Sequence, residues 1–251
     1  MSDEPLLEAT GLRLAEGSRP FDFRLSAGEI VGLAGLDGHG QAAFLEALAG
    51  VRAPLSGRVE ALRDGRRHAV RDARSGYAQG IVYLPQNRKD EGIFPSLSVL
   101  DNFRMLTLGR TGRLGFLSPH RDREAFATHR ERLGIVLASP SAPITSLSGG
   151  NQQKVLLARL LEAQPRVMLL NDPTRGVDHP TRLGLFALFD DLARDSGLGV
   201  VVLSTEIDEV VSHCHRAIVF REGAPSAELD RPALTMDAVL AAMFGQAAAA
   251  S

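Results

Sequence analysis

The sequence predicts an α/β fold with a parallel sheet covered by helices on both faces. Short, β-branched apolar runs alternate with helical patterns, as is typical of strands buried on both faces; they are Ile81 to Leu84, Val167 to Leu170, Val200 to Leu203 and Ala217 to Phe220. A strand, a glycine-rich loop and a helix follow one another between residues 29 and 48. With 251 residues and 44% hydrophobic content, the chain can also fill one large core.

Composition narrows the classes of function. The formal net charge of -2 gives no global field for nucleic acid, so we expect no nucleic-acid partner. The single cysteine and the absence of a basic and apolar leader fit a reducing cytoplasm. No apolar stretch approaches the roughly 20 residues that cross a bilayer. Any membrane role therefore requires a partner.

The N-terminal third contains the glycine-rich loop. Strand-like runs cover Leu6 to Leu14, Phe21 to Leu25, Glu29 to Leu33 and Arg58 to Leu62, and a helix is expected over Gln41 to Leu48. The loop reads Gly35-Leu36-Asp37-Gly38-His39-Gly40-Gln41-Ala42 and keeps the glycine spacing of GxxxxGK[ST], but not its lysine or hydroxyl.

In such a loop, backbone N–H groups bind phosphate, a lysine neutralises phosphate oxygens, and a hydroxyl holds magnesium. Gln41 can donate a hydrogen bond but has no charge, and Ala42 cannot ligate a metal. The backbone around Gly35, Asp37, Gly38 and Gly40 is what remains for nucleotide binding. A glycine turn without a ligand is the alternative interpretation.

The segment from Asn87 to Ser146 lacks strand patterns and contains glycine and proline interruptions. We interpret residues 87–146 as an inserted helical subdomain, with a half-buried helix over Arg121 to Leu137. Upstream, the basic stretch from Arg63 to Arg74 is interleaved with acidic residues, which favours a solvated face over a polyanion-binding surface. Residues 247–251 are expected to form a disordered tail.

The stretch Leu147-Ser148-Gly149-Gly150-Asn151-Gln152-Gln153-Lys154 opens a second predicted helix. Two glycines allow close backbone approach, and the positive end of the helix favours phosphate. This phosphate-binding end is separate from the glycine-rich loop. It indicates that the chain completes a nucleotide site belonging to another molecule.

The strand Val167 to Leu170 ends in Asn171-Asp172, where a hydrolytic NTPase places an aspartate for magnesium and a glutamate for water. Asn171 offers only a neutral carbonyl, so it is a weak magnesium ligand. Asp172 keeps a carboxylate that is one methylene shorter, which places a degenerate residue at the catalytic position. A buried strand followed by an Asx turn is the alternative.

Near the C-terminus, His213, Cys214 and His215 form a cluster of metal-ligand types. No second cysteine or spaced carboxylate pair completes a zinc set, so we expect no zinc site there.

Together these motifs resemble the nucleotide-binding domain of an ABC transporter, and in particular the C-terminal ATP-binding half of sugar importer ATPases of the ribose and galactose type. The resemblance rests on SAGEIVGLAG, YLPQNRKDEG, LSGGNQQKVLLARLL, NDPTRGVD and STEIDEV, which begin at Ser26, Tyr83, Leu147, Asn171 and Ser204. It implies one nucleotide-binding domain over residues 1–246, with a P-loop NTPase core and an N-terminal antiparallel β subdomain.

The resemblance also implies how the site works. In the family two domains dimerise head to tail, and each ATP, with Mg2+, is held between one domain's P-loop and the other's signature helix. Residues Ser148, Gly149, Gly150, Asn151 and Gln152 would contact the partner's ATP. Gln86 matches the Q-loop position, which contacts the metal and links the catalytic site to the permease. Asp178 matches the D-loop aspartate, and Thr205 takes the place of the histidine that senses γ-phosphate.

The implied partners are a second ATPase domain, an integral membrane permease and, indirectly, a periplasmic or extracellular solute-binding protein. The implied location is the cytoplasmic face of the cell membrane. Relatives usually have arginine at Gln41 and DE at Asn171-Asp172, so this chain departs further from an active site. They usually carry both halves on one polypeptide of about twice this length, so we expect either a split subunit or an excised half.

Two other classes stay open from the residues alone. One is a non-catalytic scaffold or regulatory module derived from an ABC ATPase. The other is a soluble ABC ATPase that is unconnected to transport. The solute itself cannot be inferred from this chain.

Overall fold

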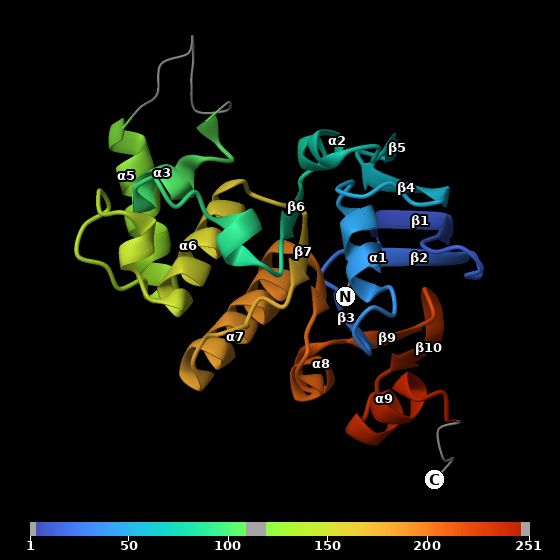
Figure 1. The fold of residues 1–251 in the computed structure, drawn as a ribbon. Helices are drawn as coiled ribbons and strands as arrows, with labels where there is room; N and C mark the ends of the chain where they lie inside the picture. Colours follow the sequence, from blue (N-terminus) through green and yellow to red (C-terminus); the bar gives the residue numbers. More distant parts are fainter. Residues whose placement is uncertain (1–3, 109–118, 247–251) are drawn as a thin grey trace. The chain divides into compact units, whose positions relative to one another are not determined.

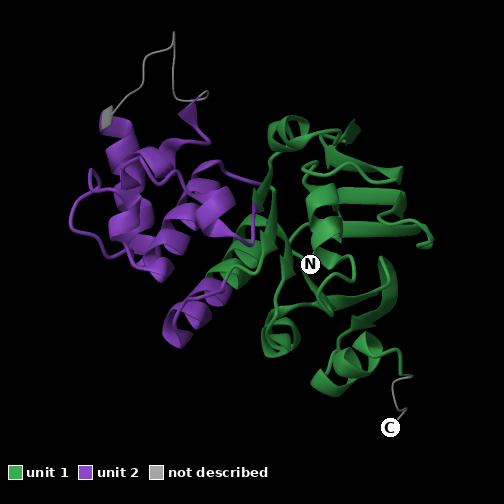
Figure 2. Cartoon of the chain, viewed as in Figure 1, with its two compact units in different colours: residues 1–83, 166–173, 188–251 green, residues 84–165, 174–187 purple. Residues whose placement is uncertain are grey.

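The computed structural model describes residues 4–108 and 119–246. The predicted tail at 247–251 and part of the predicted helical segment lie outside these ranges. The chain divides into two compact units (Figure 2). Unit 1 comprises residues 1–83, 166–173 and 188–251, and unit 2 comprises residues 84–165 and 174–187.

A four-stranded antiparallel sheet forms the N-terminal part of unit 1 (Figure 1). Its order is β2-β1-β4-β5, with β1 at Pro5–Arg13, β2 at Phe21–Ser26, β4 at Ser56–Arg63 and β5 at Arg66–Ala69. The turn between β4 and β5 places Asp64 and Gly65 at positive φ, as a tight hairpin requires. In the basic stretch, Arg67 pairs with Glu8 and Glu60. This sheet confirms the expected antiparallel β subdomain.

A six-stranded, mostly parallel sheet forms the rest of unit 1, in the order β10-β9-β3-β8-β7-β6. Its strands are β3 at Ile30–Gly35, β6 at Ile81–Leu84, β7 at Val167–Asn171, β8 at Gly199–Leu203, β9 at Arg216–Arg221 and β10 at Ala224–Asp230. The pairs β9–β3, β3–β8 and β8–β7 are parallel, and β10 runs antiparallel to β9. The predicted parallel core is therefore confirmed, with β10 as an additional edge strand.

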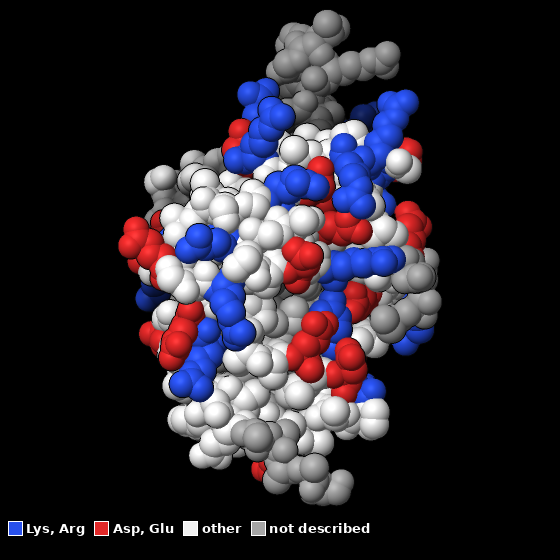
Figure 3. All heavy atoms as spheres, turned by 90° about the vertical axis from the view of Figure 1, so that its right-hand side faces the viewer, with Lys and Arg blue, Asp and Glu red and all other residues white. Residues whose placement is uncertain are grey.

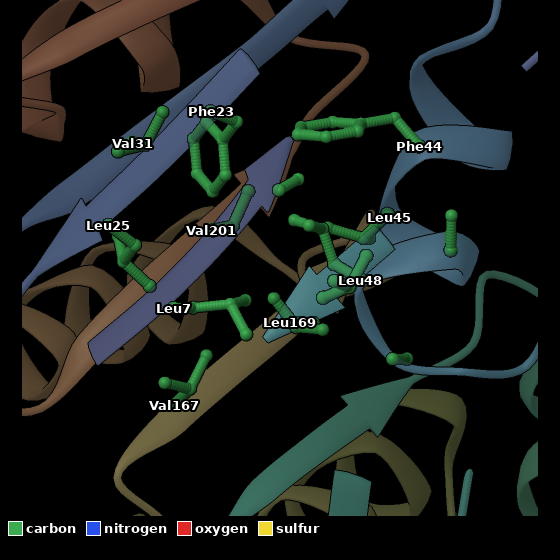
Figure 4. Close-up of a cluster of buried hydrophobic side chains, with 14 of the residues drawn as sticks. Leu7, Phe23, Leu25, Val31, Phe44, Leu45, Leu48, Val167, Leu169 and Val201 are labelled. Atoms are coloured by element: carbon green, nitrogen blue, oxygen red, sulfur yellow. The ribbon is translucent and has the colours of Figure 1, made fainter. Parts of the chain in front are cut away.

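The central strand β3 is covered on both faces because its side chains alternate. Val31 and Leu33 belong to the core that also contains Phe44 of α1 (Gln41–Leu48), as Figure 4 shows for Val31 and Phe44. On the opposite face Gly32 lies against Val210 of α8 (Ile207–His213). Burial on both faces explains why β3 reads as a continuous apolar run. The remaining helices with all residues in unit 1 are α2 at Ala73–Ala78 and α9 at Met236–Met243.

Unit 2 is helical in its described residues. It contains α3 at Val99–Arg104, α5 at Pro119–Leu133, α6 at Gly149–Glu162, a π-helical turn η1 at Arg88–Gly92 and a 3-10 turn η2 at Ile144–Ser146. The long helix α7, His179–Ser196, has residues in both units. The helix predicted over Arg121 to Leu137 is shorter than expected at its C-terminal end. Gly134 adopts φ 58° after Leu133, and Val136 is 73% exposed.

In the described part of the chain, no helix has the length and apolar character needed to cross a membrane. On the face shown in Figure 3, basic and acidic side chains are interleaved. Arg216 of β9 pairs with Glu29 and Glu228.

Candidate nucleotide-binding site

The glycine-rich loop joins the buried strand β3 to α1 within unit 1. Gly35 adopts φ 155° and Gly40, the N-cap of α1, adopts φ 108°. A Cβ at Gly40 would lie 2.9 Å from Cα of Gly223, so a larger residue does not fit there. No side chain caps α1, which leaves its first N–H groups for an external acceptor. The loop therefore keeps the backbone half of a phosphate site.

Gln41 is turned back onto this loop and is only 6% exposed. Its Nε2 donates to the main-chain oxygen of Leu36 at 2.8 Å and to that of Gly35 at 3.3 Å. Its Oε1 is buried without a hydrogen-bond partner among the described residues. The side chain thus closes the loop on itself and adds no positive charge to it.

Asp172 follows β7 and is tied to the end of the neighbouring strand β8. Its backbone adopts φ 54°, and its N–H donates to the main-chain oxygen of Leu203 at 2.7 Å. Its carboxylate accepts the Thr205 hydroxyl, with Oδ1 and Oγ1 3.2 Å apart. Asp172 and Thr205, predicted separately from the sequence, are brought together here. Their mutual hydrogen bond occupies the carboxylate that sequence reasoning placed near the attacking water.

The residues at the magnesium positions do not fit a divalent cation well. Asn171 is buried, and its Oδ1 has no hydrogen-bond partner in the described ranges, so one neutral oxygen is available. Ala42 has no side-chain oxygen. No group of three or more metal-ligating side chains occurs among the residues described. Because Mg2+ prefers charged oxygen ligands, this donor set is a poor magnesium site.

Ser148 lies at the start of α6 in unit 2, where it is exposed and serves as the N-cap. Its Oγ accepts hydrogen bonds from the Asn151 side chain, with Nδ2 at 3.0 Å, and from the Asn151 main chain, with N at 3.4 Å. Within the described ranges the Ser148 hydroxyl donates to no protein acceptor. Its proton is therefore available to a ligand in front of the helix.

Asn151 and Gln152 connect this end of α6 to neighbouring main-chain segments by hydrogen bonds. Asn151 Oδ1 accepts the main-chain N–H of Val136 at 2.8 Å. The Gln152 side chain is buried, and its Nε2 donates to the main-chain oxygens of Leu147 at 3.2 Å and Ile144 at 3.4 Å. Asn151 thus orients the Ser148 hydroxyl, while Gln152 fixes the chain that enters the helix.

Arg88 contacts this same end of α6, although the sequence had given it no role. A Cβ at Gly149 would lie 2.4 Å from Nη2 of Arg88, so the guanidinium lies directly on that glycine. At Gly150, a Cβ would meet only Val177 Cγ1 at 3.6 Å, which is ordinary contact. Arg88 and Gly149 are far apart in sequence, and no local pattern signals their contact. The YLPQNRKDEG motif contains Arg88 but does not indicate what it touches.

Two further predicted residues belong to unit 2. Asp178 precedes α7, and its Oδ1 accepts the main-chain N–H of Thr181 at 2.9 Å. Hydrogen bonds from Thr181 lower the pKa of the Asp178 carboxyl, which keeps it ionised. Gln86 is exposed two residues after the end of β6. The structure therefore places the glycine-rich loop, Asn171, Asp172 and Thr205 in unit 1, and the Ser148 region, Asp178 and Gln86 in unit 2.

The histidines near the C-terminus have structural partners. His215 Nδ1 accepts the main-chain N–H of Ile30 at 2.9 Å, and His213 Nδ1 lies 3.3 Å from Oδ2 of Asp190. Cys214 between them is buried.

A parallel sheet with a glycine loop at the end of its central strand, together with a Ser-Gly-Gly helix start, defines a P-loop nucleotide-binding fold. A family model described as ABC transporter matches residues 18–175. The chain belongs to this ABC transporter family of ATP-binding domains.

Within this family, the chain is similar to curated ribose import ATP-binding proteins. The chain is 36% identical over 244 residues to the ribose import ATP-binding protein RbsA 2 of Burkholderia pseudomallei, covering 95% of this chain and 46% of that protein. It is 35% identical over 245 residues to RbsA 1 of Rhizobium meliloti, covering 96% of this chain and 48% of that protein. The chain thus spans about half the length of the curated relatives it matches.

Solved structures share the fold. A dimeric ATP-binding cassette, MJ0796, in a post-hydrolysis state bound to ADP and Pi, is 21% identical with a TM-score of 0.76, covering 90% of this chain and 98% of that one. The ADP conformation of the cassette MJ1267 is 18% identical with a TM-score of 0.76, covering 96% of this chain and 99% of that one.

Proposed function

We propose that this chain is the ATP-binding subunit of an importer for a sugar-like solute and that it supplies its signature helix to a partner's ATP. Its own P-loop site binds nucleotide weakly and hydrolyses it little. The observation that carries the proposal is the exposed Ser148 hydroxyl, free to donate in front of α6. The ribose-import names of the relatives support the solute class.

Each residue has a stated role in this proposal. Ser148 donates to the γ-phosphate, Gly149 and Gly150 let it approach the backbone, and Asn151 and Gln152 hold the helix start in place. Asp178 reaches the partner domain, and Gln86 links nucleotide state to the permease. In the chain's own site, the backbone from Gly35 to Ala42 provides weak phosphate contacts, and Thr205 stays bound to Asp172.

The proposed assembly contains a second ATPase domain and an integral membrane permease, with a periplasmic or extracellular solute-binding protein engaged indirectly. Residues 1–246 act as one nucleotide-binding domain, whose helical subdomain covers about 87–146. It lies at the cytoplasmic face of the cell membrane. Mg2+ accompanies the ATP that the partner domain holds. This chain's own site holds Mg2+ only weakly, because the oxygen ligands around Asn171 are poor.

The test compares the purified chain with the pair that it forms with the ATPase domain co-purifying from native membranes. The chain alone is expected to show negligible ATP turnover in Mg2+, and the pair to turn ATP over. Ser148→Arg should abolish turnover by the pair, because a large cation replaces the γ-phosphate donor. Ser141→Arg, the same change at an exposed serine of unit 2, serves as the control and should leave turnover intact.

Two results would overturn the proposal. One is robust turnover by the isolated chain, and the other is an unaffected Ser148→Arg pair. Titrating the partner with ATP, with and without this chain, separates a composite site from a scaffold. An unchanged nucleotide affinity would favour the scaffold.

A further inference from the structure

The Arg88 guanidinium is held at the start of α6, the helix that begins with the Ser-Gly-Gly stretch, by contacts within unit 2. Nη1 of Arg88 donates to the main-chain oxygen of Arg175 at 3.1 Å, and Nη2 lies over Gly149. Gly149 therefore has a second requirement besides phosphate approach, because any side chain there would displace the guanidinium. Three segments that are distant in the sequence meet at this one side chain.

The backbone that carries Arg88 is anchored to α6. Arg88 begins η1, and at the other end of this turn the main-chain oxygen of Gly92 accepts a hydrogen bond, at 2.7 Å, from Nη2 of Arg159 in the last turn of α6. A Cβ at Gly92 would lie 2.8 Å from Leu156 Cδ1, so η1 packs directly on α6. The position of the guanidinium is thus fixed relative to the helix start.

The charge at this place is unbalanced. The first turn of α6 contains no acidic residue, and Arg88 forms no ion pair within the described ranges. A cation beside the positive end of a helix is electrostatically unfavourable, since helix N-termini attract anions. Nε of Arg88 is also buried without a hydrogen-bond partner among the residues described. These features together favour an anion placed beside Arg88 and the helix start.

We propose that Arg88 donates to the terminal phosphate of the nucleoside triphosphate held by the partner domain, beside the Ser148 hydroxyl. This inference rests on the function proposed above. Nη1 can keep its bond to Arg175 while Nη2 turns its N–H groups to the phosphate, because a guanidinium has five donors in a fixed plane. Arg88 then supplies the positive charge that Ser148 and the backbone N–H groups lack.

The test measures nucleotide affinity of the reconstituted pair for AMP-PNP, which carries a γ-phosphate, and for ADP, which does not. Arg88→Gln removes the charge and keeps a planar donor. We expect its dissociation constant for AMP-PNP to rise roughly 10- to 100-fold, the effect of losing a charge-assisted hydrogen bond. Its dissociation constant for ADP should stay within about twofold. Arg88→Lys should retain part of the AMP-PNP affinity.

Lys89→Gln is the matched control, because it removes the neighbouring, exposed cation and should leave both affinities unchanged. Equal weakening of AMP-PNP and ADP by Arg88→Gln would assign Arg88 a structural role and overturn the inference. So would unchanged or tighter AMP-PNP binding. If Ser148→Arg still weakens AMP-PNP in that case, the proposed function stands and only the role of Arg88 fails.

Discussion

Cys214 is a buried thiol between α8 and β9, packed against the central strand. Its Sγ lies 2.9 Å from where a Cβ at Gly32 would be. Burial raises the pKa of the Cys214 thiol; Arg231 opposes this rise, and the nearby carboxylates of Asp190 and Glu209 add to it. The folded state therefore keeps this proton at a pH where the unfolded chain loses it.

This difference predicts a pH dependence of stability. Below the unfolded thiol pKa of about 8.5, both states hold the proton and the group has no effect on the pH slope. Above it, the free energy of unfolding should fall by up to about 1.4 kcal/mol per pH unit from this group alone. Urea denaturation from pH 7.5 to 10 should show a steeper decline for the wild type than for Cys214→Ala. Parallel pH curves would contradict the prediction.

Asn151 makes two separable contacts, one with the Val136 main-chain N–H and one with the Ser148 hydroxyl. Asn151→Asp keeps an acceptor for the Val136 N–H but loses the Nδ2 donor to Ser148 and places a negative charge beside the proposed phosphate site. An acid in the first turn of a helix is favourable, so thermal stability should be unchanged or slightly higher. Turnover by the reconstituted pair should fall by at least about tenfold. Asn151→Ala, which loses both contacts, should lower stability as well as turnover. Equal turnover in wild type and Asn151→Asp would refute this role.

The packing of α8 on β3 depends on a glycine at the contact. A Cβ at Gly32 would lie 2.5 Å from Val210 Cγ1, so Gly32→Ala must displace α8 or the strand. We expect a loss of about 1–3 kcal/mol in the free energy of unfolding, the usual cost of overpacking.

Gly184→Ala is the matched control, because Gly184 lies in α7 with nothing within 4 Å of its Cβ position. It should stabilise the chain by about 0.5–1 kcal/mol through helix propensity. Denaturant titrations of both variants measure the difference, and a neutral Gly32→Ala would contradict the packing argument.

The buried elements were predictable from the sequence because burial leaves a continuous apolar pattern. The helix α1 and the strand β6 have the predicted bounds, β7 and β8 are one residue longer at one end, and β9 is one residue longer at each end. The strands β5 and β10 were missed because they are exposed on one or both faces and contain charged residues. An edge strand is formed by hydrogen bonds to its neighbour, which the sequence pattern does not reveal.

In the candidate site, too, features with a local sequence pattern could be predicted, whereas contacts between distant segments could not. The glycine-rich loop and the Ser148 region are contiguous motifs, so both could be located from sequence. The hydrogen bond between Asp172 and Thr205 joins the ends of two neighbouring strands, and the contact of Arg88 with Gly149 joins two distant segments. Such pairs depend on the folded chain and could not be read from local spacing.

In the whole molecule, the two proposed phosphate-binding ends, the glycine-rich loop and the Ser148 region, belong to different compact units and differ in chemistry. The end in unit 2 offers a free hydroxyl and a guanidinium, whereas the loop in unit 1 offers backbone groups alone. This asymmetry is what a domain would need to serve a partner's nucleotide more than its own.

Restoring the lost groups tests this asymmetry. Gln41→Lys with Ala42→Thr returns a charge and a magnesium-binding hydroxyl to the loop, and we expect the isolated chain to bind Mg-ATP roughly 10- to 100-fold more tightly. The wild type should bind ATP weakly and equally in Mg2+ or EDTA, as measured by calorimetric titration. Gln41→Lys with Ala43→Thr controls for the hydroxyl, since it places the same group one residue further along α1. Turnover should remain negligible in both variants, because the Asp172 carboxylate stays bound to Thr205. Tight, magnesium-dependent ATP binding by the wild type would show that the native loop is a functional nucleotide site. It would contradict the proposed difference between the two ends.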